Sequence, residues 1–201
     1  MATMAISPKD VSELRARTGA GMMDCKKALE EAAGDMEKAA DILRKKGIAK
    51  ADKRTGRSAS EGIVVTYVHH NHQVGVLLEL NCETDFVART DLFKELAREI
   101  ALHVASADPV GVNPEDVPAA LVERERRIAE EQVAAEGKPE NIRAKIVEGK
   151  IRKFIAERTL TDQPFVKDDK KTVGQMIKEA SGKLGEVVAV KRFARFRVGD
   201  A

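Results

Sequence analysis

The spacing of hydrophobic residues changes once along the chain, near residue 62, and this change most constrains the fold. Before it, apolar residues recur every three or four positions, which is the period of a helix. After it come two runs rich in Val, Leu and Ile, residues 62–68 and 74–82, whose composition is typical of strands. We therefore expect an α+β fold, in which a helical module precedes a sheet packed with helices.

The first 47 residues are expected to form a module of three short helices. Ser7 and Pro8 suit the start of the first helix, and Gly19, Gly34 and Gly47 suit the three helix ends. The second helix has an apolar face made of Cys25, Ala28, Leu29 and Ala32. So small a module has a marginal core, and we expect it to lean on the rest of the chain or on a partner. Residues 48–61 are small, polar and basic, and we interpret them as a linker.

Residues 62–201 are expected to form the core domain. The polar stretch between the first two strands is predicted to be a hairpin turn, and a third strand over residues 186–198 completes an antiparallel three-stranded sheet with helices on one face. Further helices are predicted over residues 91–105, 115–136, 140–158 and 173–181. Only residues 137–139 separate the middle two, which predicts an antiparallel helical hairpin over about 115–158. Their net charges of −4 and +3 favour that pairing.

Several function classes find no support in the sequence. The formal net charge of +2 gives no strong field to attract nucleic acid or a membrane surface. Phosphate-binding loops, nucleophile motifs and zinc-protease motifs are missing, so we expect no enzyme, no cofactor and no metal site. No apolar signal core or membrane span is found, and the two cysteines, Cys25 and Cys82, cannot form a disulfide framework. We therefore expect a cytoplasmic protein with free thiols.

Three features leave other interpretations open. The histidines at 69, 70 and 72 form either a metal site or a polar hairpin turn, although no carboxylate or cysteine at zinc-like spacing completes a site. Cys25 lies beside two lysines and is either a reactive thiol or a small core residue. The stretch 44–57 has a net charge of +6, and the last strand adds Lys191, Arg192, Arg195 and Arg197. These cations indicate either an RNA- or ribosome-binding protein or a solvated linker and surface face.

Two long segments carry a specific resemblance. Residues 14–29 read LRARTGAGMMDCKKAL, and residues 79–89 read ELNCETDFVAR. Both closely resemble the signature motifs of the elongation factor Ts family, in the family's order and separation. The resemblance continues through residues 137–139, 147–150 and 163–166 and covers nearly the whole chain. Longer family members carry a duplicated core subdomain and a further helical module, so this sequence resembles the short bacterial-type forms.

The resemblance implies a function in translation and protein biosynthesis. It predicts a ubiquitin-associated-like N-terminal module and a guanine-nucleotide exchange factor that acts on elongation factor Tu without covalent chemistry. Such a factor binds the GDP-bound partner, displaces its magnesium ion and promotes GDP release so that GTP can bind. Short forms are thought to pair through their cores, which implies a homodimer or a complex with two copies of each protein. Direct binding to nucleic acid or membrane is not implied.

The resemblance also assigns partner-binding residues. The stretch Thr84, Asp85, Phe86 and Val87 is expected to enter the nucleotide-binding domain of elongation factor Tu and shift a helix beside the magnesium site. The N-terminal module is expected to dock on the same domain through Leu14, Arg15, Met22 and Met23. From the residues alone, Phe86 and both methionines would be assigned to the chain's own core, and Asp85 to the cap of a turn. The resemblance reverses these assignments.

Overall fold

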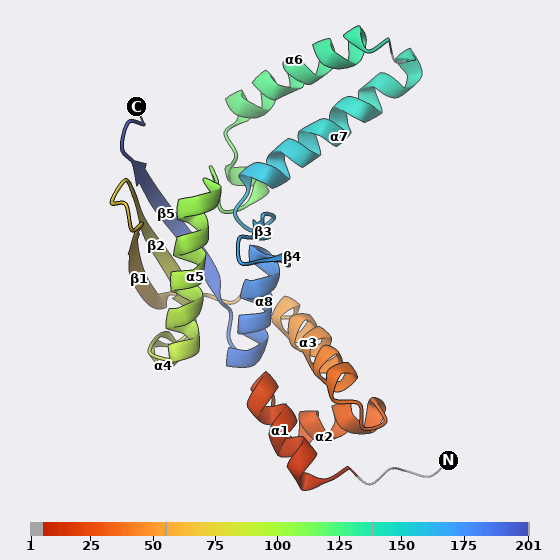
Figure 1. Ribbon diagram of the computed structural model, residues 1–201, viewed down its shortest axis with the longest axis vertical. Coiled ribbons are helices and arrows are strands. Elements are labelled where there is room, and N and C mark those ends of the chain that lie inside the picture. Colours follow the sequence, from red (N-terminus) through yellow and green to blue (C-terminus); the bar gives the residue numbers. More distant parts are fainter. Residues whose placement is uncertain (1–5, 55, 138, 201) are drawn as a thin grey trace. The chain divides into compact units, whose positions relative to one another are not determined.

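The computed structural model describes residues 6–54, 56–137 and 139–200 of the 201-residue chain. Contacts between these residues group them into two compact units. The first takes its described residues from 6–62, 81–94 and 177–189, and the second from 63–80, 95–176 and 190–200. The fold is α+β, as predicted, with a helical N-terminal module and an antiparallel three-stranded sheet (Figure 1).

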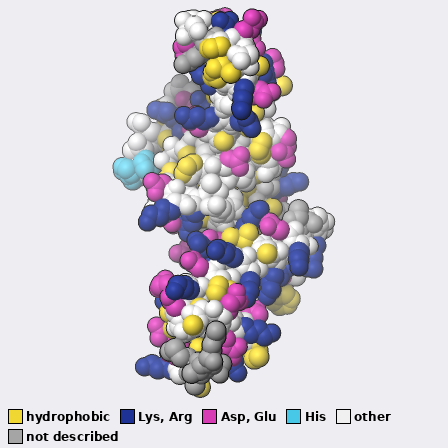
Figure 2. Space-filling model, turned by 90° about the vertical axis from the view of Figure 1, so that its right-hand side faces the viewer, with side chains coloured by type: hydrophobic (Ala, Val, Ile, Leu, Met, Phe, Trp, Pro, Cys, Tyr) yellow, Lys and Arg dark blue, Asp and Glu magenta, His cyan; other side chains and the backbone are white. Residues whose placement is uncertain are grey.

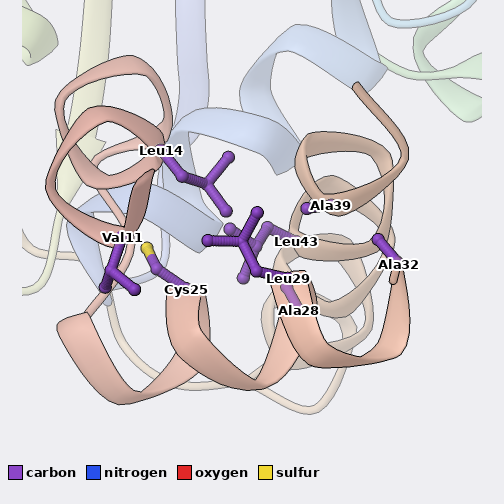
Figure 3. Packing of buried hydrophobic residues seen from close by; sticks show 8 residues of the cluster. All are labelled: Val11, Leu14, Cys25, Ala28, Leu29, Ala32, Ala39 and Leu43. Atoms are coloured by element: carbon purple, nitrogen blue, oxygen red, sulfur yellow. The ribbon is translucent and has the colours of Figure 1, made fainter. Parts of the chain in front are cut away.

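The N-terminal module consists of three helices, α1 (Pro8–Thr18), α2 (Met22–Glu31) and α3 (Met36–Asp52). The Ser7 hydroxyl accepts a hydrogen bond from the Asp10 amide and caps α1, and the Asp35 carboxylate caps α3 in the same way. The helices enclose one small core, where the labelled side chains point toward one another (Figure 3). Its buried members are Val11, Leu14, Cys25, Ala28, Leu29, Ala32, Ala39 and Leu43.

The third helix is longer than the sequence predicts. It continues through Gly47 to Asp52, so the predicted end of the helix at Gly47 was wrong. The physical reason is a contact with α8 (Val173–Leu184): a Cβ added to Gly182 would lie 2.8 Å from the carbonyl carbon of Gly47. Two glycines thus let the helix backbones meet, and this packing offsets the roughly 1 kcal/mol that a glycine costs inside a helix. The division of the chain into domains at 47 and 61 stays a prediction.

The sheet is made of β1 (Glu61–Val68), β2 (Val74–Cys82) and β5 (Ala189–Arg197), in the order β1-β2-β5. Val76, Leu78 and Leu80 of β2 are buried, which marks the covered face of the sheet. Helix α5 (Asp91–Ala107) runs along the strands (Figure 1). The helix predicted over residues 91–105 is confirmed, and its apolar face is buried through Phe93, Leu96, Ala97, Ile100, Ala101 and Val104.

The predicted helical hairpin is present as α6 (Ala119–Ala135) and α7 (Glu140–Arg158). The two helices pack through a core of their own, formed by Ala129, Val133, Val147 and Ile151. The predicted start at residue 115 was early, because Pro114–Asp116 form a separate 3-10 turn. Lys150 of the basic helix donates a hydrogen bond of 2.8 Å to Gln132 and lies 3.9 Å from Glu136.

A second, two-stranded sheet follows the hairpin and was not predicted. Strands β3 (Pro164–Phe165) and β4 (Asp168–Thr172) pair antiparallel within a stretch that the sequence marks only as turn-rich. Buried Gln163 supports it, with its Oε1 2.9 Å from His103 Nε2 and its amide donating to the Glu157 carbonyl. Burial lowers the pKa of His103, which favours the neutral imidazole.

Candidate protein-binding site

The segment that follows β2 turns one large apolar side chain outward. Cys82, fully buried, ends the strand, and the four-residue helix α4 (Asp85–Ala88) begins three residues later. Thr84 caps this helix, because its hydroxyl oxygen accepts a 3.4 Å hydrogen bond from the Val87 amide. Ala88 faces inward and is buried, whereas Phe86 is 80% exposed.

The exposure of Phe86 decides between its two interpretations. Leu80 and Cys82 already fill the inward positions at the end of β2, and both are completely buried. The helical turn at residue 85 then carries Phe86 away from that layer, so its assignment to the core was wrong. At 80% exposure, most of the phenylalanine remains available for contact with another protein. Its contact with a partner stays a prediction.

The other residues of this stretch are held in different ways. Asp85 pairs with Arg89 one helical turn later, at 2.8 Å, in an exposed ion pair of small energetic weight. The Thr84 carbonyl accepts a 3.1 Å hydrogen bond from the Cys82 thiol. Burial raises the pKa of that thiol, and the nearby Glu186 charge adds to the effect, so the sulfur keeps the proton it donates. Glu186 also binds Thr84 directly.

The N-terminal candidates divide into surface and core. Met22 and Met23 begin α2 and are 44% and 64% exposed, and Arg15 is exposed on α1. Two flexible thioether side chains of this kind form an adaptable apolar surface. Leu14, by contrast, is completely buried in the core of the module and offers no surface to a partner. The helical spacing of Val11 and Leu14 was the signal for this burial.

The other chemistry suggested by the sequence receives little support. The histidines occupy the turn between β1 and β2, where His69 Nδ1 lies 3.0 Å from the Tyr67 hydroxyl, which confirms the hairpin interpretation. Among the described residues, no group of three or more His, Cys, Asp or Glu side chains is arranged to hold a metal ion. Cys25 is fully buried in the module core, as the second interpretation of that residue proposed.

The basic residues that favoured an RNA-binding interpretation mostly have partners within the chain. Lys46 and Lys50 pair with Glu31 and Asp24, at 2.6 and 2.9 Å. Further pairs join Arg44 to Asp41, Arg57 to Glu83, Arg192 to Glu79 and Arg195 to Asp108. On the face drawn in Figure 2, basic and acidic side chains are interspersed. This pattern favours the interpretation as a solvated surface over a phosphate-binding patch.

No helix in the described part of the chain is long and apolar enough to cross a membrane.

Fold and site together define the class: an α+β protein whose candidate site is an exposed side chain on an ordered surface segment. The sequence model of a family described as elongation factor TS matches residues 2–200. Elongation factor Ts of Thermosipho melanesiensis is 56% identical over 195 residues, which are 97% of this chain and 100% of the relative. The proteins of the same name from Desulfosudis oleivorans and Koribacter versatilis are 54% and 55% identical, covering 97% and 98% of this chain and 98% and 90% of those relatives. This chain belongs to the elongation factor Ts family.

Proposed function

We propose that this protein is a guanine-nucleotide exchange factor for elongation factor Tu and performs no covalent chemistry. It binds the GDP-bound partner, displaces the magnesium ion and promotes GDP release, so that GTP can bind, in the cytoplasm. The observation that carries the proposal is the 80% exposure of Phe86 within the family's second signature motif. Burial of a phenylalanine is worth about 1.5–3 kcal/mol, which is enough to hold a displaced helix in the partner.

The exchange mechanism works through charge and coupling. Nucleotide phosphates in such GTPases are held by backbone amides, a lysine and magnesium, so displacement of the metal removes the largest local positive charge. In the proposal Phe86 enters the partner beside the magnesium site, while Thr84, Asp85 and Val87 shape the approach. Linkage then requires that nucleotide weakens binding of the factor as much as the factor weakens binding of nucleotide. The complex of elongation factor Tu, GDP and this protein is therefore short-lived and loses either GDP or the factor. After GDP has left, GTP binds and displaces the factor.

The N-terminal module supplies a second contact in this proposal. Met22, Met23 and Arg15 are exposed and would lie against the nucleotide-binding domain of elongation factor Tu. Leu14 supports this surface indirectly, because it packs in the module core and holds α1 against α2 and α3. Two separate contacts raise the effective concentration of each one and thus the overall affinity.

A second copy of the chain is the partner that we propose for the outer face of the sheet. Each of the three strands carries exposed large apolar side chains, in β1 and β2 at positions that alternate with more buried ones, beside an ion pair between Arg192 and Glu79. The apolar side chains are Val64 (62% exposed), Val68 (59%), Leu77 (47%), Phe196 (73%) and, directly after β5, Val198 (72%). Exposed apolar side chains on all three strands of one sheet are typical of an interface. Pairing through it gives a homodimer, or a complex with two copies of each protein.

One measurement tests the exchange proposal directly. Release of fluorescently labelled GDP from elongation factor Tu is followed after addition of the purified chain and excess unlabelled GDP. We expect the release rate to rise with the concentration of the chain and then to saturate. An unchanged rate, with a partner that a known exchange factor does accelerate, would overturn the proposal.

A further inference from the structure

The segment that carries Phe86 is held by a carboxylate from a distant part of the chain. Glu186 lies 102 positions from Thr84 in the sequence. Its Oε2 accepts hydrogen bonds from the amides of Glu83 and Thr84, at 3.1 and 3.0 Å, and its Oε1 accepts one of 2.6 Å from the Thr84 hydroxyl. A single carboxylate therefore binds three donors on the two residues that precede α4.

The interaction is reciprocal. The Glu83 carboxylate accepts a 2.8 Å hydrogen bond from the Val187 amide, and its other oxygen lies 3.5 Å from the Arg57 guanidinium. Each glutamate thus binds the backbone of the other's segment, and we call Glu83, Thr84, Glu186 and Val187 the glutamate clamp. Hydrogen bonds from backbone amides to ionised carboxylates are shorter and roughly twice as strong as neutral ones.

The clamp is anchored on the end of α8. The Ser181 hydroxyl donates to the Glu186 carbonyl, and Gly185, with a φ of 78°, closes the helix by donating its amide to the Ser181 carbonyl at 2.9 Å. The Arg54 guanidinium donates to the same Ser181 carbonyl at 3.4 Å. Helix α8 is itself fixed against α3 by the Gly47–Gly182 contact. Glu186 therefore extends from a packed helix and not from a free loop.

The segment after β2 needs such a support. Helices shorter than about 12 residues are marginal on their own, and α4 has only four residues. Its cap, Thr84, uses the same hydroxyl to accept from the Val87 amide and to donate to Glu186. The clamp thereby fixes the residue at which α4 begins, and with it the direction of Phe86. Without the clamp, binding to a partner would have to order this segment at a cost in affinity.

We propose that Glu186 is a positioning residue for nucleotide exchange, which acts by holding Glu83 and Thr84 so that Phe86 is presented in a fixed direction. This inference rests on the proposed function. Among the described residues Glu186 has no ion-pair partner, so its charge is directed at the donors of the clamp. Its side chain touches neither nucleotide nor magnesium in this proposal, and its effect passes through Phe86.

Two variants of Glu186 and one control test the inference. Glu186→Ala removes all three acceptor contacts, Glu186→Gln keeps an oxygen that accepts from the two amides, and Glu131→Ala removes an exposed glutamate of α6. For Glu186→Ala we expect GDP release at limiting factor to slow about tenfold, since loss of hydrogen bonds to a charged group corresponds to roughly that factor. Glu186→Gln should fall between the parent chain and Glu186→Ala, because it keeps one accepting oxygen but loses the charge, and Glu131→Ala should match the parent chain.

A double-mutant cycle separates positioning from general damage. If Glu186 acts through Phe86, adding Glu186→Ala to Phe86→Ala should slow GDP release less than about twofold further. The same tenfold loss in both backgrounds would overturn the inference, and so would a Glu186→Gln variant as slow as Glu186→Ala with an unchanged melting temperature.

Hydrogen exchange tests the clamp without the partner. Amides of residues 83–88 should exchange faster in Glu186→Ala than in the parent chain, while those of α1 and α2 should not change. Unchanged exchange over residues 83–88 would refute the clamp whatever the GDP assay shows. Suppose that hydrogen exchange becomes faster in this segment while the parent chain fails to accelerate GDP release from elongation factor Tu. That result would refute the proposed function and leave the clamp in place.

Discussion

Truncation of Phe86 is the substitution that most sharply separates a binding residue from a core residue. Because Phe86 is 80% exposed, its ring makes few contacts within the free protein, and Phe86→Ala therefore removes little packing. We expect the free energy of unfolding to change by no more than about 0.5 kcal/mol, as for other surface substitutions. For a chain of this size that corresponds to a melting temperature within about 2 °C of the parent.

The effect on exchange should be much larger. Complete burial of a phenylalanine is worth about 1.5–3 kcal/mol, and the exposed four-fifths of this ring leave about 1.2–2.4 kcal/mol to gain at an interface. Loss of that amount from the exchange-competent complex slows GDP release roughly 8- to 60-fold. The assay is stopped-flow release of labelled GDP from elongation factor Tu at limiting factor, with calorimetric melting of the same preparation.

Leu80→Ala provides the matched control, because Leu80 lies on β2 and is completely buried. A buried leucine costs about 2–5 kcal/mol when truncated, so this variant should melt several degrees lower. If Phe86→Ala instead behaves like the control and loses about 3–5 kcal/mol of stability, the side chain belongs to the core and the reasoning fails. If stability and GDP release are both unchanged, Phe86 is a surface residue without a part in exchange.

The other predictions concern the module, the sheet face and the domain boundary. Leu14→Ala should destabilise the module by about 2–5 kcal/mol, whereas Met23→Ala should leave melting unchanged and weaken binding to elongation factor Tu, measured by titration calorimetry. The reverse pattern would contradict the surface assigned here. Phe196→Asp places a charge on the outer sheet face and should halve the mass of the free protein, or of its complex with elongation factor Tu, in light scattering. Thr66→Asp, at an exposed position of β1 between Val64 and Val68, should weaken the pairing less. A parent chain present as a single copy both alone and in the complex would refute the pairing. Removal of residues 1–56 deletes the whole of α3 together with α1 and α2. It should weaken binding to elongation factor Tu and leave a core that still unfolds cooperatively, as followed by circular dichroism.

The sequence predicted most clearly those elements whose hydrophobic pattern is long and local. The helix over residues 91–105 and the hairpin of β1 and β2 were predicted to within two residues, because the helix repeats its apolar residues at one period and each strand is a local run rich in Val, Leu and Ile. The extension of α3 could not be read in the same way, since Gly47 signals a helix end locally and only its contact with Gly182 explains why the helix continues. Strands β3 and β4 are too short to carry a period at all.

The candidate site shows the same limit. The motif around Phe86 stands out in the sequence, but the alternation along β2 alone could not show that α4 turns the ring outward. Glu186 gives no local signal, because it lies in an ordinary stretch after α8 and its three contacts reach residues about a hundred positions away. Leu14 was assigned to the partner-binding surface because of its place within a signature motif, whereas its burial follows from the helical spacing that it shares with Val11.

The core of the α6–α7 hairpin sets a rule for changes in its length. Ala129 and Val133 stand one helical turn apart on α6, and Val147 and Ile151 stand one turn apart on α7. Loss of a single residue from one helix rotates everything beyond it by about 100°, which carries the next buried side chain into water. Changes of equal length on both helices keep the buried side chains of α6 opposite those of α7. A tolerated deletion or insertion in one helix of the hairpin should therefore be matched by one of equal length in the other helix. Its length should be close to a whole number of helical turns.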